Sequence, residues 1–428
     1  MPEKVERKRL TEIGTTGLER QAGHVTEEFL TQLQGDRAVK VYTEMAENDP
    51  MIGAILFAVE MLIRGVTWHV DPVDSTMEAH RYAEFAESLL EDMSMSWEDT
   101  ISEILSMLVY GWSYHEIVYK LRKGENKDPR LRSKFDDGYY GWRKLPIRSQ
   151  KTLDRWEFDD SGGVQGMWQV ALPDYQKRFI PIDKALLFRA ESRRGNPEGK
   201  SVLRNAYRPW YFKKNFEEIE GIGIERDLAG MPVAWVPPEL LSEDASSEEK
   251  MILESIKKII TNIRRDEQEG VVFPLAYDDN GNKMYDLQLM ASAGTRQFDT
   301  ESVIARYDQR ISMTVMADFL LLGHEAVGSM ALGVTKAQLF TSGLTAWLKV
   351  IASVFNRFAL PKVFELNGFP KEMLPELRAG DIRLPDLGAL SNYIQKLSAT
   401  GMPLWPDEQL ENHLRDMAGL PPVPPKEG

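Results

Sequence analysis

The sequence predicts an α+β fold that is mainly helical and is organised around two amphipathic helices with a compact insert between them. In the first helical stretch, residues 203–228, apolar side chains recur at steps of two to four, close to the period of a helix. In the second stretch, residues 300–322, they recur at steps of three and four, and Asp299 is placed to cap the N-terminus. Prolines and a polar run, 242–249, separate the two helices and predict a small independent body.

The insert is predicted to contain one helix and one hairpin. Residues 251–263 place isoleucines on one side of a helix, with acidic residues before it and basic residues after it, which suits the helix dipole. Residues 271–277 and 283–289 flank Asp279-Asn280-Gly281, a sequence that permits positive φ and therefore predicts a β-hairpin.

The rest of the chain alternates between helix and strand patterns. Residues 1–35 are polar and rich in glycine, so we expect an arm that extends along a neighbour or is partly disordered. Capped by Asp49 and Pro50, a helix is expected to continue to Arg64. Further predicted helices are 37–47, 77–93, 96–110, 335–360, 387–400 and 407–417, and predicted strands are 66–70, 114–121, 142–145, 154–158, 166–172, 178–180 and 186–189. Between them, residues 122–134 read as a basic, exposed loop, and Gly343 predicts a kink or a close approach in the long helix.

Charge and composition exclude several classes of protein. The formal net charge is −14, from 66 acidic and 52 basic residues, which is the opposite of what a protein gripping a phosphate backbone shows. This negative charge argues against a repressor or a nuclease. It suits a channel, because a negatively charged wall repels phosphates and lets a DNA duplex move along it. The absence of cysteine excludes disulfides and thiolate metal sites and fits a reducing cytoplasm. The longest apolar run, residues 51–63, is shorter than the roughly 20 residues that a membrane-spanning helix needs.

Several short motifs suggest chemistry, but each lacks a required partner. Asp160-Ser161-Gly162-Gly163 is read as a hairpin turn rather than as a serine nucleophile loop. His115-Glu116 and His324-Glu325 begin like a zinc motif but have no second histidine four residues on. Asp278 to Asn282 resembles a calcium-binding loop, but its glycine is not at the sixth position and no glutamate stands at the twelfth. The sequence also contains no Walker lysine motif. We therefore predict no catalytic residue, metal site or cofactor.

The order of several motifs resembles the portal proteins of tailed bacteriophages, and most closely their Mu-type branch. No single motif carries this resemblance, which covers most of the chain. The motifs are Gly199-Lys200-Ser201 before the first helix, Glu225-Arg226 and Gly230-Met231-Pro232 at its end, Gly328-Ser329 and Ala331-Leu332-Gly333 after the second helix, Asp49-Pro50 with Trp68 upstream, and Asn367-Gly368 downstream.

The resemblance implies a subunit with a wing, two stem helices, an α/β clip, a tunnel loop and a reduced crown. The implied parts are an N-terminal arm (1–35), the wing (36–200), the first stem helix (201–229), the clip (230–297), the second stem helix (298–322), the tunnel loop (323–334), a long helix with the remainder of the wing (335–384), the crown (385–420) and a disordered tail (421–428). Residues 323–333 are rich in small side chains, and without the resemblance they would be read as an ordinary flexible connection.

The same resemblance implies a structural, non-enzymatic subunit of a homo-oligomeric ring, a dodecamer, at one capsid vertex of the virion, assembled in the host cytoplasm. Double-stranded DNA would pass through the ring without sequence specificity, and the large terminase, a head–tail adaptor and the major capsid protein would be partners, with no membrane. Implied site residues are His324, Glu325, Ser329 and Met330 facing DNA, Lys213 and Lys214 contacting phosphates, and Lys257, Lys258, Arg264 and Arg265 forming a docking surface on the clip. The basic group on the clip also suits a solvated helix face. The alternatives are a head-maturation hydrolase and a minor head or adaptor protein that binds DNA ends.

Overall fold

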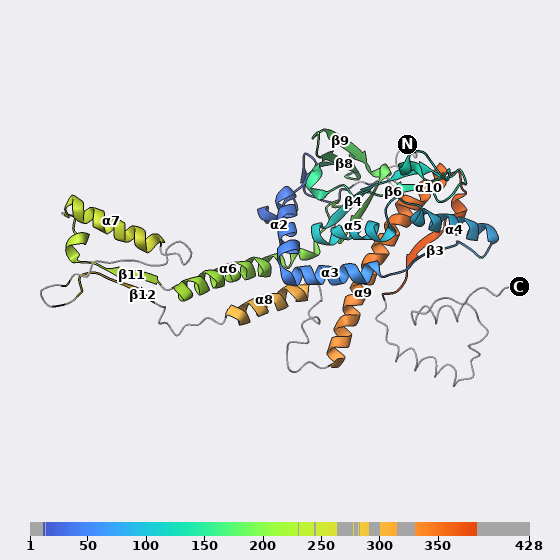
Figure 1. Ribbon diagram of the computed structural model, residues 1–428. Coiled ribbons are helices and arrows are strands. Elements are labelled where there is room, and N and C mark those ends of the chain that lie inside the picture. The colour runs from blue at the N-terminus through green and yellow to red at the C-terminus, as the bar shows by residue number, and fades with distance from the viewer. Residues whose placement is uncertain are drawn as a thin grey trace. The chain divides into compact units, whose positions relative to one another are not determined.

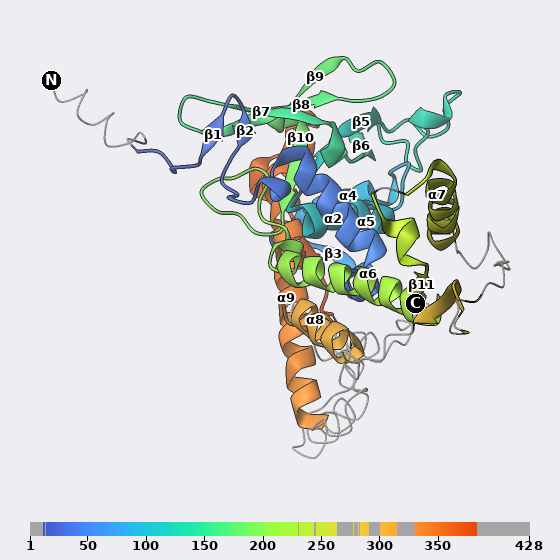
Figure 2. The same ribbon diagram turned by 90° about the vertical axis from the view of Figure 1, so that its left-hand side faces the viewer.

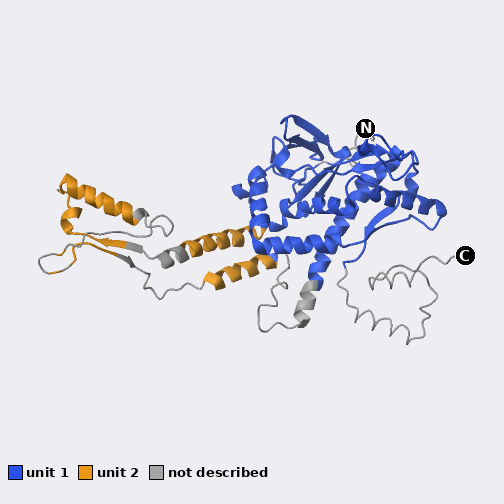
Figure 3. Ribbon diagram, in the orientation of Figure 1, with its two compact units in different colours: residues 1–204, 314–428 blue, residues 205–313 orange. Residues whose placement is uncertain are grey.

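The computed structural model describes residues 12, 14–229, 231–243, 245–262, 277, 281, 283–290, 300–314 and 330–382 (Figure 1). The chain divides into two compact units, one formed by residues 1–204 with 314–428 and the other by residues 205–313 (Figure 3). Each unit has its own helices and strands.

The helices of the larger unit are α2 (Gly35–Asn48), α3 (Pro50–Arg64), α4 (Met77–Glu91), α5 (Trp97–Tyr110), α9 (Met330–Val354) and α10 (Leu360–Leu366). Two of them, α3 and α5, have an end at a residue that the sequence marks. The Asp49 carboxylate accepts hydrogen bonds from the backbone N–H groups of Met51 and Ile52 at 2.9 and 3.0 Å, which confirms the predicted cap of α3. Gly111 ends α5 at φ 92°, where a Cβ would meet the Glu198 carbonyl oxygen at 2.4 Å, so only glycine fits.

The strands of the larger unit form small antiparallel sheets. They are β1 (Arg20–Gln21), β2 (His24–Val25), β3 (Trp68–Asp71), β4 (Trp112–Glu116), β5 (Val118–Leu121), β6 (Tyr140–Lys144), β7 (Leu153–Phe158), β8 (Val164–Val170), β9 (Lys177–Pro181), β10 (Ala185–Arg189) and β13 (Glu376–Ala379). The sheets are β1-β2, β4-β10, β5-β6, β3-β13 and the three-stranded β7-β8-β9. The single strand predicted at 114–121 is two strands with different partners, and β13 was not predicted.

The core of the larger unit forms where α4 and α5 meet the C-terminal helices. Leu344, Ile351 and Phe355 are fully buried there, together with Leu89 and Ile104. One helical stretch in the described part of the chain, Gln338–Leu366, is long and apolar enough to cross a membrane. Leu344, Leu348 and Ile351 of this stretch are buried in the core, whereas Leu339, Phe358 and Leu366 are exposed.

The long C-terminal helix departs from the prediction at both ends. It begins at Met330 rather than at residue 335, and it passes through the π-helix η8 (Phe355–Ala359) into α10. Pro361 follows the π-helix and has no N–H for the helical ladder, which explains an irregularity at that point. Among the described residues no atom lies within 4 Å of a Cβ built at Gly343, so they make no close approach there.

The described part of the N-terminal arm packs on its own chain. The β1-β2 hairpin lies beside β7 (Figure 2), where the Gly23 carbonyl accepts a hydrogen bond of 2.9 Å from the Trp156 backbone N–H. The Arg204 guanidinium donates to Glu28 Oε1 at 2.8 Å. Residues 14–34 therefore contact their own subunit, whereas the sequence predicted an arm that extends along a neighbouring subunit or is partly disordered.

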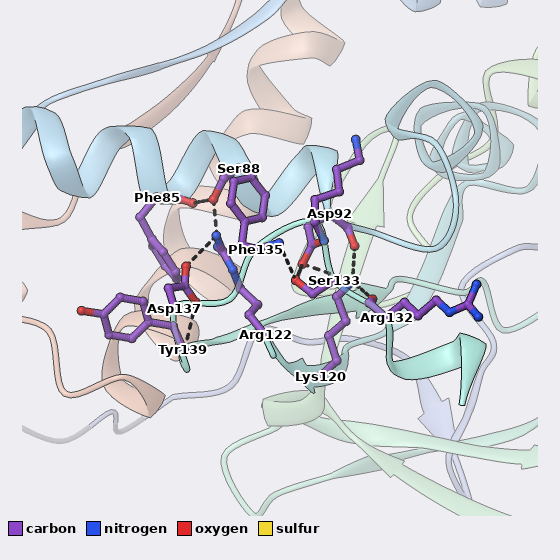
Figure 4. A network of polar contacts seen from close by, with 11 residues as sticks. Phe85, Ser88, Asp92, Lys120, Arg122, Arg132, Ser133, Phe135, Asp137 and Tyr139 are labelled. Carbon is purple, nitrogen blue, oxygen red and sulfur yellow. Dashed lines mark hydrogen bonds and ion pairs between the residues drawn. The ribbon is translucent and has the colours of Figure 1, made fainter. Parts of the chain in front are cut away.

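The loop after β5 is held by buried charges rather than exposed throughout (Figure 4). The side chains of Lys120 and Asp92 are 3% and 2% exposed, and Lys120 Nζ lies 3.1 Å from Asp92 Oδ2. Asp92 also accepts hydrogen bonds of 2.7 Å from Ser133 Oγ and the Lys134 N–H. Arg122, predicted to be exposed, is 2% exposed because it pairs with Asp137 at 2.7 Å and covers the Phe135 ring. These contacts fix both ends of the loop on the protein.

The smaller unit is a pair of helices with an α/β insert, as the sequence predicts. It contains α6 (Tyr207–Ala229), β11 (Met231–Trp235), α7 (Ser247–Asn262), β12 (Asp286–Met290) and α8 (Thr300–Thr314). The bridge from Tyr277 to Lys283 is compatible with the predicted turn, but the described partner of β12 is the unpredicted strand β11. Asp299 and residues 315–322 lie outside the described residues.

Short 3-10 helices complete the two units. In the larger unit they are η1 (Thr31–Leu33), η2 (Pro129–Leu131), η3 (Gln150–Thr152), η4 (Ile182–Lys184), η5 (Val202–Arg204) and η9 (Lys371–Met373), and in the smaller unit η6 (Pro238–Leu241).

Candidate functional site

Helices α6 and α8 pack side by side in an antiparallel pair (Figures 1 and 2). Near the start of α6, Lys213 Nζ lies 2.6 Å from Oδ1 of Asp308, in the second half of α8. Near the end of α6, Glu220 accepts a hydrogen bond from the Thr300 hydroxyl at the start of α8. The rings of Phe212 and Phe216 stack on Tyr307 with centroids 6.3 and 5.8 Å apart. The pair is therefore joined by charge, hydrogen bonding and aromatic contact along its length.

The two lysines proposed to contact phosphates differ in position. Lys213 is 3% exposed, and besides Asp308 it has Glu217 at 3.8 Å, so carboxylates of its own unit neutralise its charge. This position does not favour a phosphate contact. Lys214 is half-buried, and its ammonium lies 5.8 Å from the centroid of the Trp210 ring.

Two arginines on α8 are better exposed than either lysine. Arg306 and Arg310 are one helical turn apart, and their guanidinium carbons lie 5.6 and 5.5 Å from the centroid of Tyr307. The sequence reasoning missed them. Their spacing of four residues on a predicted helix is a signal that could have found them, because residues at i and i+4 share one face.

Apolar side chains remain exposed on α6. Ile219 and Ile222 are 61% and 48% exposed, and Tyr211 earlier on the helix is 48% exposed. The apolar pattern that predicted this helix therefore includes side chains that the described residues of the subunit leave exposed. Apolar surface of this kind marks an interaction site in many proteins.

The predicted docking surface on the insert is described only in part. Lys257 and Lys258 are exposed on α7, with Lys257 Nζ 3.1 Å from Glu254 Oε1. Arg264 and Arg265 lie outside the described residues. The insert also exposes Trp235.

The predicted tunnel loop overlaps the start of α9. His324, Glu325 and Ser329 lie outside the described residues. Met330 was assigned to the loop, but it is the first residue of α9, and the helix also takes in residues 331–334. The predicted boundary at residue 334 is therefore wrong, because the small residues there read as a loop although they begin a helix.

Two of the motifs that suggested chemistry, at His115 and at Asp159, have structural roles, whereas His324-Glu325 and most of the stretch from Asp278 to Asn282 lie outside the described residues. His115 is fully buried between β-strands, where burial lowers its pKa to about 4 and the Leu145 carbonyl oxygen lies 2.8 Å from Nδ1. Asp159 accepts hydrogen bonds from Ser161 and the Gly163 N–H, which closes the predicted hairpin turn. Within the described ranges, no group of three or more His, Asp or Glu side chains is placed to hold a metal ion.

Comparison with known proteins decides the family. A family model described as the portal protein of Mu bacteriophage matches residues 39–420 of the chain. The chain belongs to this family of phage portal proteins. The resemblance predicted from the order of motifs is thereby confirmed.

Two solved structures of low sequence identity share the fold of this portal protein. The neck of an empty GTA particle, computed with C6 symmetry, is 12% identical, with 90% of this chain and 94% of that chain covered and a TM-score of 0.50. The virion of a native gene transfer agent particle is 11% identical with the same coverage and TM-score. An HK97-family phage portal protein from Corynebacterium diphtheriae is 11% identical, with 84% and 96% covered and a TM-score of 0.42. At these identities the likeness concerns the fold alone.

Proposed function

We propose that this portal protein is the subunit of a closed ring at one capsid vertex, through which double-stranded DNA enters and leaves the head. The observation that carries the proposal is the antiparallel pair α6 and α8, joined by an insert at one end and bearing an exposed apolar face. Repetition of one interface around an axis buries that face in every copy, and a heterologous interface closes into a ring when the rotation permits. The neck structure of the same fold, computed with C6 symmetry, is compatible with such an arrangement.

In this proposal the stem helices contact DNA with few positive charges. Arg306, Arg310 and Lys214 offer cations to phosphates, while Lys213 is neutralised by Asp308. The net charge of −14 per subunit, multiplied around a ring, repels phosphates and keeps adhesion low. Such a channel guides a duplex without reading its sequence and without catalysis of its own.

The insert is proposed to be the docking surface for the packaging machinery. Lys257 and Lys258 on α7, together with Arg264 and Arg265, which lie outside the described residues, supply positive charge to an acidic face of the large terminase or of a head–tail adaptor. The major capsid protein would contact the larger unit, and the mature complex would lie in the virion.

The assembly itself tests the proposal. Native mass spectrometry of the purified full chain should give one closed, high-order species, and electron micrographs should show rings with a central opening. A chain that stays monomeric or dimeric at micromolar concentration would contradict the ring. Hydrolase activity of such a monomer would support the head-maturation enzyme, and binding to DNA ends would support the minor head or adaptor protein.

The loop before α9 is proposed to restrain packaged DNA. Replacing residues 324–329 by glycine and serine, at unchanged length, should leave rings intact and lower the fraction of particles that retain DNA. That fraction is measured by nuclease protection after packaging. Rings that fail to form would show instead that this segment is needed for assembly, and unchanged retention would remove it from the DNA contact.

A further inference from the structure

A cleft in the larger unit lies between the long C-terminal helix and strand β13. Its volume is about 480 Å³, and its apolar lining comes from the buried side chains of Leu348, Ala352 and Leu377. Residues of α9 and η8 form one wall, and β13 with the two residues that follow it forms the other. Since β3 is the one described strand that pairs with β13, the opposite edge of β13 has no strand partner among the described residues.

This free edge of β13 offers backbone hydrogen-bonding groups to the cleft. In an antiparallel ladder, alternate residues direct both of their backbone groups to the same side. Gly380 faces β3, because its N–H donates to the Thr67 carbonyl oxygen at 2.8 Å. Leu377 faces away from β3 and bonds through its N–H and its carbonyl oxygen to the Asn356 amide at 2.8 and 2.9 Å. By this alternation Ala379 also faces away from β3, into the cleft that it lines, where neither backbone group bonds to a described residue.

Asn356 therefore takes the place of one residue of a neighbouring strand, and the position beside Ala379 is open to another chain. A strand edge with unpaired N–H and carbonyl groups is a template for an added strand. The open position is short, because Asn356 closes one end of the edge at Leu377.

The two walls of the cleft differ in charge. The charged side chains that line it are Lys349, Arg357, Glu376, Arg378 and Asp381. On the strand wall, Arg378 is held by the carboxylates of Glu376 at 2.8 Å and Asp71 at 3.2 Å. On the helix wall both charged side chains, Lys349 and Arg357, are cations, and neither forms an ion pair with a described residue. The helix wall therefore attracts anionic groups.

An extended peptide with acidic side chains matches all three features of the cleft. Its backbone can both donate to and accept from Ala379, its carboxylates can reach the two cations of the helix wall, and its other side chains can pack over the apolar lining. A helix lacks the first ability, because its backbone groups are bonded within the helix. The phosphate backbone of a nucleic acid lacks it too, since it has no N–H to donate.

We propose that this cleft binds an extended, acidic segment of a partner protein, which adds a short strand to β13. The segment pairs with the backbone of Ala379, and its carboxylates face Lys349 and Arg357. The site lies within the larger unit and does not depend on the proposed passage of DNA, so either proposal can fail without the other.

Peptide binding to the full chain tests the proposal. The probe is a fluorescein-labelled peptide, Glu-Val-Glu-Val-Glu-Val, and the control is Lys-Val-Lys-Val-Lys-Val, both measured by fluorescence anisotropy. The acidic peptide should bind saturably and about tenfold or more tightly than the basic one, because it forms ion pairs where the basic peptide meets like charges. No saturable binding of the acidic peptide up to about 1 mM, or equal affinity for both peptides, would overturn the proposal.

Hydrogen exchange tests strand addition separately from charge. The acidic peptide should slow exchange of the Ala379 amide, whereas the Leu377 amide, already bonded to Asn356, should change little. Single amides are resolved by mass spectrometry with electron-transfer fragmentation. Binding that leaves the Ala379 amide unprotected would overturn the added strand.

Matched substitutions locate the binding. Lys349→Glu with Arg357→Glu should weaken binding of the acidic peptide by about tenfold or more, since two exposed ion pairs contribute up to roughly fivefold each. Arg81→Glu with Lys371→Glu makes the same change of net charge at exposed positions outside the cleft and should leave the affinity unchanged. Equal weakening by the two double variants would refute recognition by this cleft.

The chain without peptide distinguishes the other occupants. We expect the Ala379 amide to exchange fast in the purified chain. Slow exchange at every protein concentration would show that residues after Ile382 of the same chain already cover the edge. Slow exchange that appears only on assembly would assign the edge to a second copy. Either result would overturn binding of a partner segment.

Discussion

At the scale of single residues, Glu198 is a carboxyl group that the fold prefers to keep protonated. Burial raises its pKa to about 7, although the Trp156 Nε1–H donates a hydrogen bond to it at 3.2 Å. In the unfolded chain a glutamate has a pKa of about 4.3. Between these values the folded protein holds a proton that the unfolded chain has released, so stability falls as pH rises through this window.

The prediction is that Glu198→Gln removes this loss. The thermal midpoint should rise by about 2–4 °C at pH 8 and stay nearly unchanged at pH 4, as measured by differential scanning fluorimetry. Glu84→Gln on an exposed helix face is the control and should change neither value. An equal rise at both pH values would show that the charge of Glu198 is not the cause.

The buried pair of Asp92 and Lys120 leads to a second prediction at this scale. Asp92→Ala leaves the Lys120 ammonium, 3% exposed, without its counter-ion and should cost about 3–5 kcal/mol of stability. It also removes the acceptor for Ser133 and Lys134, so trypsin should cleave the loop between residues 123 and 134 faster. The double variant Asp92→Ala with Lys120→Met should recover part of the stability. Additive losses would mean that the two charges do not interact.

At the scale of elements, Asn356 joins the π-helix η8 to β13. Its amide donates to the Leu377 carbonyl at 2.9 Å and accepts from the Leu377 N–H at 2.8 Å. We predict that Asn356→Ala costs about 1–3 kcal/mol, because both backbone groups of a buried residue lose their partner. Hydrogen exchange at the Leu377 amide should accelerate, whereas the exposed neighbour substitution Arg357→Ala should leave it slow. If the exchange rate of the Leu377 amide is unchanged in Asn356→Ala, its protection comes from the pairing of β13 with β3 and not from Asn356.

The elements that sequence predicts well are those whose signals are local. Asp49 with Pro50 fixes the start of α3, and Gly111 fixes the end of α5, because caps and left-handed glycines act over a few residues. Strands β11 and β13 were missed because each pairs with a strand more than fifty residues away, so only tertiary contacts define them. The start of α7 could have been predicted, since Ser246 and Glu249 form a capping box.

At the scale of the whole molecule, the family and the helix–insert–helix arrangement could be predicted, whereas the exposure of individual side chains could not. Lys213 and Lys214 look equivalent in sequence, yet a rotation of about 100° per residue along a helix turns Lys213 toward Asp308. This ion pair joins residues almost a hundred positions apart in the sequence. The periodicity of one helix therefore cannot predict which of its lysines forms the pair. The spacing of Arg306 and Arg310 places them on one face of α8, but the exposure of that face likewise depends on what α8 packs against.

The exposed face of α6 gives the prediction that bears most directly on assembly. Ile219 and Ile222 are 61% and 48% exposed, so a charge at either position has water available in the single subunit and should leave its folding intact. In a ring that buries this face, each copy of an Ile219→Glu, Ile222→Glu variant would place two unpaired carboxylates in an apolar contact, at a cost of several kcal/mol per interface. Native mass spectrometry should therefore show monomers whose thermal midpoint and circular dichroism match those of the native subunit. The control Met77→Glu, which adds a carboxylate at an apolar position of α4 that is 90% exposed, should still assemble. Intact rings of the double glutamate variant would place this face toward solvent and require another surface to join the subunits.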